Sequence, residues 1–190
     1  LRFILEHFPV ERFYTGIPLA HLDLQLLTIL QRHQIPVTIL PEGWTVLTSP
    51  SGTRLQIFTP QQSHHDKNER SLIVYAGNDK EGVLLTGDMG PAGFKQLLAT
   101  NLPGPVTLLK LPHHGSRRPA ARSYLSLLSP EITFVSVGRY NPFHLPAATT
   151  LQQLEAAGTP LYRTDQQGTL VFQSREQGWQ ASHWHDRLFD

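Results

Sequence analysis

The sequence of 190 residues contains no cysteine. This absence excludes disulfide bonds, cysteine-ligated zinc sites and thiol catalysis, and it fits either redox compartment. No apolar run approaches the roughly 18–20 residues that a membrane-spanning helix needs, and the chain opens without a secretory signal peptide. The net charge is only +1, so any contact with nucleic acid must come from a local basic patch and not from a global positive field.

The composition that remains is that of a folded globular chain. Hydrophobic residues make up 39% and charged residues 16%, which excludes a disordered polymer. A length of 190 residues suits one domain with a real core, and we expect residues 1–190 to form a single domain. The chain begins at Leu1 rather than Met, inside a segment of helical composition, so we expect it to be a fragment of a longer protein.

Hydrophobic periodicity and turn residues divide the chain into strands and helices. The predicted strands are 10–14, 37–40, 44–48, 53–58, 71–75, 83–86, 106–111, 132–137, 161–163, 169–172 and 179–184. The predicted helices are 1–7, 21–33, 91–99, 119–128 and 146–157. Hairpins dominate the first half and strands alternate with helices in the second. This mixture predicts an α/β fold, a layered sandwich of two sheets covered by helices.

Two predicted apolar strands are followed by residues of the types that commonly serve as metal ligands. One strand leads into Thr86-Gly87-Asp88, and the other leads into Pro112-His113-His114. If the two strands are neighbours in one sheet, Asp88 and the two histidines converge at the same edge, where imidazole and carboxylate suit a divalent ion. Taken alone, Asp88 suits a helix N-cap equally well, because the predicted helix 91–99 follows closely. The interpretation of Asp88 as a metal ligand therefore depends on whether it lies close to the two histidines.

Basic residues follow the two histidines. Arg117, Arg118 and Arg122 either clamp phosphate oxygens near the metal or form the solvated start of a helix. Cations at a helix N-terminus are electrostatically misplaced, which favours a functional role for them. Arg139 and Arg163 are candidates for the same edge.

Other histidines are weaker candidates. His144 stands near the end of strand 132–137, either facing the site or as an ordinary loop residue before a helix. His64-His65-Asp66 lies in a polar, aperiodic segment that we expect to be a solvated loop. His183 and His185 have strand spacing, but they lie too near the chain end for a metal role to be favoured.

Four motifs together resemble one known family. They are Leu84-Leu-Thr-Gly-Asp88, Leu109-Lys-Leu-Pro-His-His-Gly-Ser116, Val135-Ser-Val-Gly-Arg-Tyr-Asn-Pro-Phe-His-Leu-Pro146 and Tyr162-Arg-Thr-Asp-Gln-Gln-Gly168. In this order and spacing, over most of residues 71–172, the chain resembles the C-terminal domain of the competence protein ComEC family. That family imports transforming DNA through the bacterial inner membrane. The resemblance implies a metallo-β-lactamase-like αββα sandwich with a metal site at the sheet edge.

The resemblance also implies roles for single residues. Asp88 matches the bridging aspartate between two metal ions, Mn²⁺ or Zn²⁺, and His114 matches a late metal-ligand histidine. His113 beside it supports the ligand His114, binds the metal itself or donates a proton. The expected catalytic residues are His113 and Ser116, one of which contacts the phosphate or protonates the leaving oxygen. Arg117, Arg118, Asn141 and His144 are the expected substrate-binding residues, and Asn68 and Ser71 resemble the family's Asn-Asn-x-Ser stretch with Glu69 in place of the second Asn.

The sequence departs from the family pattern at two places. The His-x-His-x-Asp-His motif of the fold is absent from these residues, and in the family it lies shortly before the position of Leu1. Either the fragment omits that motif or the chain cannot build a complete site. The family also usually has His just before the Pro at position 146, where this chain has Leu145, with His144 one place early.

The function expected from the resemblance is that of a metal-dependent nuclease that degrades the non-imported DNA strand. Its partners are single-stranded DNA, the membrane-embedded channel portion of the same polypeptide and other DNA-uptake proteins. The resemblance places the domain on the outer face of the inner membrane. The alternatives are a hydrolase for another phosphodiester, a metal-free module that binds or guides DNA, and a purely structural domain.

Overall fold

The computed structural model of the chain describes residues 1–47, 53–61, 66–118, 121–176 and 178–183. The strands are β1 Phe13–Thr15, β2 Val37–Ile39, β3 Gly43–Leu47, β4 Arg54–Thr59, β5 Ile73–Gly77, β6 Gly82–Leu85, β7 Leu108–Lys110, β8 Ile132–Val135, β9 Leu161–Arg163, β10 Leu170–Arg175 and β11 Gly178–His183. The helices are α1 Arg2–His7, α2 Leu24–Arg32, α3 Pro91–Leu98, α4 Ala121–Leu128, α5 Ala148–Ala156 and α6 Thr164–Gln167, with 3₁₀ turns η1 Leu19–His21, η2 Asn68–Arg70 and η3 Pro112–Gly115. The α/β class is confirmed.

A seven-stranded sheet forms the centre of the molecule, in the order β3-β4-β5-β6-β7-β8-β9. The pairs from β3 to β6 are antiparallel, because short connections join these strands. The pairs from β6 to β9 are parallel, because α3, α4 and α5 return the chain between them. Strand β6 therefore belongs to an antiparallel half and to a parallel half of the same sheet.

The adjacency on which the metal prediction depended is confirmed. Strands β6 and β7 are parallel neighbours, and Leu85 is the register partner of Lys110. Strand β8 lies on the other side of β7, with Phe134 opposite Lys110. Parallel strands end at the same edge of a sheet, so the segments that follow β6, β7 and β8 leave the sheet side by side.

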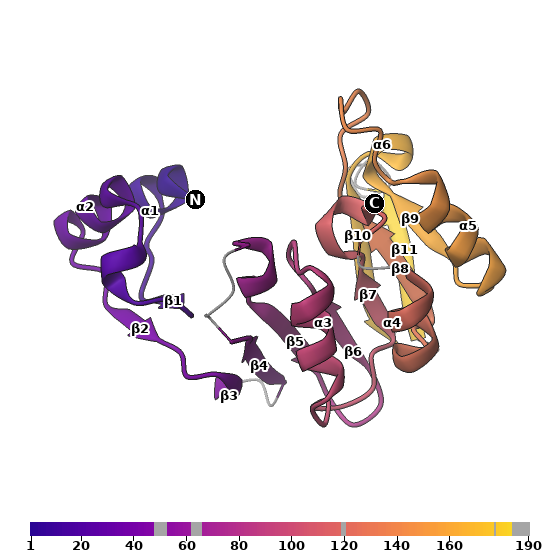
Figure 1. Cartoon of the computed structure of the whole chain (residues 1–190), viewed down its shortest axis with the longest axis horizontal. Helices are drawn as coiled ribbons and strands as arrows, with labels where there is room; N and C mark the ends of the chain where they lie inside the picture. The colour runs from indigo at the N-terminus through magenta and orange to yellow at the C-terminus, as the bar shows by residue number, and fades with distance from the viewer. Residues whose placement is uncertain (48–52, 62–65, 119–120, 177, 184–190) are drawn as a thin grey trace.

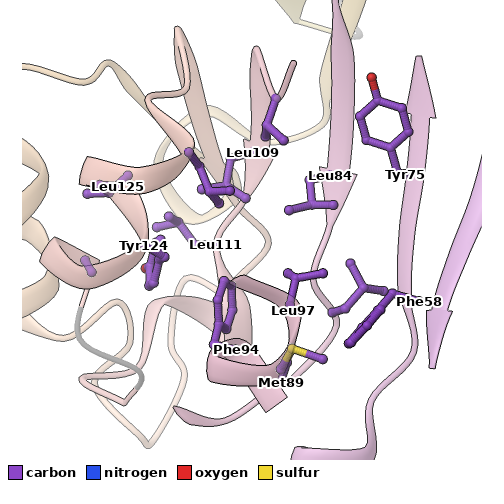
Figure 2. Packing of buried hydrophobic residues seen from close by; sticks show 14 of the residues in the cluster. Phe58, Tyr75, Leu84, Met89, Phe94, Leu97, Leu109, Leu111, Tyr124 and Leu125 are labelled. Atoms are coloured by element: carbon purple, nitrogen blue, oxygen red, sulfur yellow. The ribbon is translucent and has the colours of Figure 1, made fainter. Parts of the chain in front are cut away.

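The helices α3 and α4 cover one face of this sheet (Figure 1). Alternate strand residues point toward them, and the resulting core is shown in Figure 2. From the sheet it contains Phe58, Ile73, Tyr75, Leu84, Leu109 and Val135, and from the helices Phe94, Leu97, Tyr124, Leu125 and Leu128. All of these side chains are buried. Burial of this apolar surface fixes the sheet and the helices rigidly against each other beneath the strand ends.

The opposite face of the sheet is partly covered by the β10–β11 hairpin. The ring of Phe172 packs against Phe134 and Tyr162, with centroids 5.1 and 5.5 Å apart. The indole Nε1 of Trp179 donates to the hydroxyl of Thr107 at 2.8 Å. Within the part of the chain that the structure describes, the expected second sheet thus consists of this two-stranded ribbon. The four-layer αββα arrangement stays a prediction.

The N-terminal elements have a hydrophobic cluster of their own. Helices α1 and α2 and the short parallel pair β1–β2 surround it, and they lie to one side of the large sheet in Figure 1. Its buried members are Leu5, Leu26, Ile29, Leu30 and Ile35. Asp23 caps α2 by accepting a hydrogen bond from the Leu26 N–H at 3.1 Å. No helix in the described residues is long and apolar enough to cross a bilayer.

The predicted elements are confirmed apart from details at their ends. The predicted loop 61–70 contains the short turn η2, and α6 follows β9 where no helix was predicted. The predicted hairpin turn between β3 and β4 lies outside the described residues, and so do His64, His65 and His185. His183 lies on β11, as its spacing predicted.

Candidate metal and phosphate site

A tight turn after β6 positions Asp88. Gly87 has a positive φ of 54°, which glycine adopts without strain. Its carbonyl accepts the His113 N–H at 3.1 Å, and the buried hydroxyl of Thr86 donates to the Lys110 carbonyl at 2.7 Å. These bonds fasten the turn of Asp88 to the segment that follows β7. The carboxylate of Asp88 is therefore held beside the two histidines by backbone contacts.

The two histidines occupy an unusual backbone conformation in η3. His113 and His114 have φ angles of 46° and 53°, in the left-handed region that side chains with a Cβ rarely adopt. Gly115 follows with a φ of 74°. Strained residues of this kind persist only where the surroundings hold them, and they concentrate at functional sites. The strain at His113-His114 marks this turn as the strongest candidate site in the described residues.

The two ring nitrogens of His114 have different partners. Nδ1 lies 2.6 Å from the carbonyl oxygen of Ser136, at the end of β8. Because a carbonyl oxygen can only accept, Nδ1 carries the proton, and Nε2 faces the Oδ1 atom of Asp88 at 3.6 Å. About half of each side chain is exposed to solvent, 46% for His114 and 45% for Asp88. An imidazole whose Nδ1–H is held by a carbonyl presents Nε2 in the orientation that metal ligands take.

The distance between these two atoms fits a shared cation. Two ligand atoms that each lie about 2.1 Å from one ion, at a tetrahedral angle, are about 3.4 Å apart. The 3.6 Å separation of His114 Nε2 and Asp88 Oδ1 is close to that value. A catalytic ion needs about three protein ligands, and the described residues bring no three histidine, aspartate or glutamate side chains together. The pair therefore fits one side of a divalent-metal site.

A cavity of about 580 Å³ opens over this pair. Asp88, His113, His114, Ser116, Arg117, Phe143, Leu145 and Ala147 line it. A second hollow of about 480 Å³ shares three of these residues, His113, Ser116 and Arg117, and adds Arg118 and Asn68 among others. The predicted pair Arg117 and Arg118 is thus placed beside the histidines, where guanidinium groups suit phosphate oxygens. The two hollows meet at His113, Ser116 and Arg117, and we call them together the groove. Asp88 and His114 line its first hollow, and Arg118 lines its second.

The loop between β8 and α5 forms the far wall of the cavity. Asn141, one of the predicted substrate contacts, uses its side-chain amide within this loop, donating to the carbonyls of Gly138 and Leu145 and accepting the Leu145 N–H. Leu145 lines the cavity, whereas His144 is exposed with a φ of 53°. The loop therefore presents Leu145 to the cavity of Asp88 and His114, at the position where the resembled family usually has histidine. A substrate contact of His144 stays a prediction.

The other predicted arginines lie elsewhere. The backbone N–H of Arg122 donates to Gln153, and Arg122 lines a separate cavity between α4 and α5. Arg163 forms a double hydrogen bond to the carboxylate of Asp165, at 3.1 and 2.7 Å. This bond is the main reason why the pKa of Asp165 is lowered. Nε of Arg139 donates to the Asp165 carbonyl at 3.2 Å.

Lys110 is a residue of this site to which sequence reasoning gave no role. Its ammonium lies 3.5 Å from the Gly87 carbonyl and 3.3 Å from that of Leu111. Burial lowers the pKa of Lys110, and the negative charge of Asp88 opposes this effect. A lysine between leucines in a strand expected to be buried was the available signal. Through its contact with the Gly87 carbonyl, Lys110 stabilises the turn that positions Asp88.

Comparison with known proteins gives similarity to three proteins. The chain is 29% identical over 139 residues to "Uncharacterized protein YcaI" of Escherichia coli. It is 29% identical over 106 residues to "ComE operon protein 3" of Bacillus subtilis, and 30% identical over 145 residues to "Recombination protein 2" of Haemophilus influenzae. No protein-family model matches the chain.

These similarities cover much of this chain and little of the relatives. The aligned region covers 72% of this chain for the Escherichia coli protein, 56% for the Bacillus subtilis protein and 72% for the Haemophilus influenzae protein. The chain spans only 14–18% of the length of each relative. The similarity to the protein of the ComE operon agrees with the resemblance carried by the four motifs.

Proposed function

We propose that this chain is a divalent-metal-dependent phosphodiesterase domain that cleaves one strand of DNA during DNA uptake. The observation that carries the proposal is the meeting of Asp88 and His114 at the ends of neighbouring parallel strands, 3.6 Å apart. Arg117 and Arg118 line the same groove. A metal ligand pair next to guanidinium groups suits hydrolysis of a phosphate ester better than that of a neutral substrate.

In this proposal each residue has a defined task. Asp88 and His114 would hold the metal, Mn²⁺ or Zn²⁺. The resemblance implies two ions in a metallo-β-lactamase-like αββα domain, with further ligands from a His-x-His-x-Asp-His motif that these 190 residues lack. When bound, the metal lowers the pKa of a water molecule and neutralises charge on the phosphate. Arg117 and Arg118 bind the phosphate oxygens. His113 and Ser116 line the same cavity. In this proposal one of them contacts the phosphate or protonates the leaving oxygen.

The names of the relatives support the choice of DNA as substrate. "ComE operon protein 3" and "Recombination protein 2" are both consistent with the DNA-uptake role that the four motifs imply. In the proposed setting the domain belongs to a longer protein of the bacterial inner membrane and faces away from the cytoplasm. Its partners are single-stranded DNA, the channel portion of the same polypeptide and other DNA-uptake proteins.

A second candidate function is a metal-free module that guides DNA through the same groove. It is favoured by the finding that only two potential ligands meet in the described residues. In that case the contact between His114 and Asp88 is structural, and Arg117 and Arg118 supply the affinity for DNA.

The test is cleavage of a labelled single-stranded oligonucleotide with Mn²⁺ or Zn²⁺. We would compare this chain with a longer chain, extended before Leu1 by a segment that supplies the His-x-His-x-Asp-His motif. Asp88→Asn and His114→Gln are introduced into the longer chain. The matched controls are Asp79→Asn and His33→Gln, which remove the same groups from exposed positions away from the groove. We expect each site variant to lose more than the roughly 10–100-fold that loss of an outer-shell partner costs, and each control to retain its activity.

The outcomes separate the two candidates. Cleavage that depends on the metal and on both site residues supports the phosphodiesterase. Cleavage that survives both substitutions refutes the assigned site. Oligonucleotide binding that resists chelator, without cleavage in any divalent ion, supports the guiding module. In both functions the affinity for DNA falls as salt rises, because phosphate contacts release counterions.

A further inference from the structure

Two aromatic side chains stand exposed on the loop that contributes Phe143 and Leu145 to the cavity. Tyr140 and Phe143, both in the loop between β8 and α5, are 91% and 77% exposed. Phe143 lines the same cavity as Asp88 and His114. The loop extends beyond the end of the sheet in Figure 1. Single exposed hydrophobic residues need no explanation, but two aromatic rings within four residues beside a candidate active site do.

The loop that carries them is held in a fixed shape. The three hydrogen bonds of the Asn141 amide close it internally. At its base, the hydroxyl of Thr164 accepts the Val137 N–H at 2.7 Å, and at its end the Ala147 N–H donates to the Gly115 carbonyl at 2.9 Å. A ring on such a loop loses little conformational freedom when a ligand packs against it. Tyr140 and Phe143 therefore have the properties of preorganised contacts.

The basic residues near the rings are Arg139 and Arg117, and the carboxylate of Asp88 lines the same cavity as Phe143. Arg139 precedes Tyr140, and its Nε is fixed to the Asp165 carbonyl at 3.2 Å. Arg117 lines the cavity together with Phe143. Flat apolar rings interleaved with guanidinium groups match a ligand that alternates flat bases with phosphates. A neutral peptide or an acidic protein offers only part of this pattern.

We propose that Tyr140 and Phe143 form a base-stacking platform that selects single-stranded DNA for the groove. The inference rests on the proposed function and adds the two residues that recognise unpaired bases. Unpaired bases expose their faces and stack on the two rings while the phosphates meet the arginines. In duplex DNA the base faces are buried in the stack, so the rings reach them only where the duplex is unstacked. The platform thus discriminates between strands by the availability of base faces.

The test measures binding with chelator present, so that it does not depend on a metal or on cleavage. Fluorescence anisotropy is recorded at low salt with three labelled probes: (dT)15, an abasic strand of the same length, and a 15-base-pair duplex. The variants are Phe143→Ala, Tyr140→Ala and the conservative Phe143→Trp. Leu127→Ala is the matched control, because Leu127 is 66% exposed on α4 and lines a different hollow.

We expect the wild-type chain to bind (dT)15 more tightly than the abasic strand. Phe143→Ala should weaken binding of (dT)15 by about 5- to 100-fold and leave binding of the abasic strand unchanged. Tyr140→Ala should also weaken binding of (dT)15. Phe143→Trp should bind (dT)15 as tightly as the wild type does. Equal affinity for (dT)15 and the abasic strand, tighter binding of the duplex, or no binding of (dT)15 would each overturn the platform. So would Phe143-dependent binding to phosphatidylglycerol vesicles without base dependence, which would assign the rings to a membrane surface.

Failure of the platform can be distinguished from failure of the nuclease. Metal-dependent cleavage by the longer wild-type chain, together with base-independent binding, refutes the platform and leaves the phosphodiesterase intact. Base-dependent binding without cleavage in any divalent ion refutes the phosphodiesterase and keeps the platform within the guiding module.

Discussion

Glu69 controls the start of the helix that follows Asp88, and its removal is the sharpest stability test of the site. Helix α3 begins at Pro91, and its N-cap residue Gly90 has no side chain to satisfy the exposed backbone N–H groups. Instead, Oε2 of Glu69, from η2, accepts the Gly93 N–H at 2.7 Å. A Cβ at Gly90 would lie 2.3 Å from the Glu69 carboxylate, so the two residues fit each other closely.

The expected loss follows from two contributions. A hydrogen bond to a charged acceptor contributes roughly 1.5–3 kcal/mol when buried, and less here because Glu69 is only half-buried. A carboxylate at a helix N-terminus contributes about 0.3–1 kcal/mol through the helix dipole. We expect Glu69→Ala to lower the free energy of unfolding by about 1–2 kcal/mol. Glu69→Gln keeps an acceptor and loses the charge, so it should cost roughly half as much.

The measurement is urea unfolding at pH 7, with the thermal midpoint as a second readout. At this chain length 1 kcal/mol corresponds to about 2–4 °C. Glu155→Ala, which removes an exposed carboxylate from the last turn of α5, is the control and should not destabilise the protein. Unfolding free energies of Glu69→Ala and the wild type that agree within about 0.3 kcal/mol would refute the capping role.

Two further predictions concern the ion pair of Asp165 with Arg163 and the turn at Gly115. Asp165 has a lowered pKa, so its bond to Arg163 stabilises the fold above the unfolded pKa near 3.8 and is lost as the pH falls through the lower folded value. The stability difference between the wild type and Asp165→Asn should therefore be present at pH 7 and shrink below about pH 4 in urea unfolding; a difference that grows on acidification would contradict this. Gly115→Ala should destabilise by about 1–3 kcal/mol, because the residue has a φ of 74° and the new Cβ would lie 2.8 Å from Pro146. Gly138→Ala, where a Cβ meets open space, is its control, and equal midpoints for the two variants would refute the clash.

Much of the fold could be predicted because its signals are local. Apolar strands bounded by Gly and Pro, and helices with Pro in the first turn, are visible in the sequence, and the parallel pairing of β6 with β7 follows from the helix between them. The meeting of Asp88 with His114 could be predicted for the same reason, since parallel strands end at one edge.

The remaining features depend on where loops turn in space. The left-handed conformation of His113 and His114, and the direction that presents Leu145 instead of His144 to the cavity, are set by hydrogen bonds between distant segments. The Glu69 cap joins residues 24 positions apart. The exposed rings of Tyr140 and Phe143 were visible in a motif, but their exposure depends on the loop that Asn141 closes.

The change from antiparallel to parallel pairing at β6 also determines when the site can exist during folding. Residues 77 and 82 pair across a tight turn, whereas residues 83 and 108 are 25 positions apart and residues 108 and 132 are 24 apart. Closing such long loops is slow and costs chain entropy before any contact repays it. The meander from β3 to β6 can therefore form early, while the contact of His114 with Ser136 waits for β8. We therefore expect a nascent or partly folded chain to contain the meander but to lack the groove beside His114.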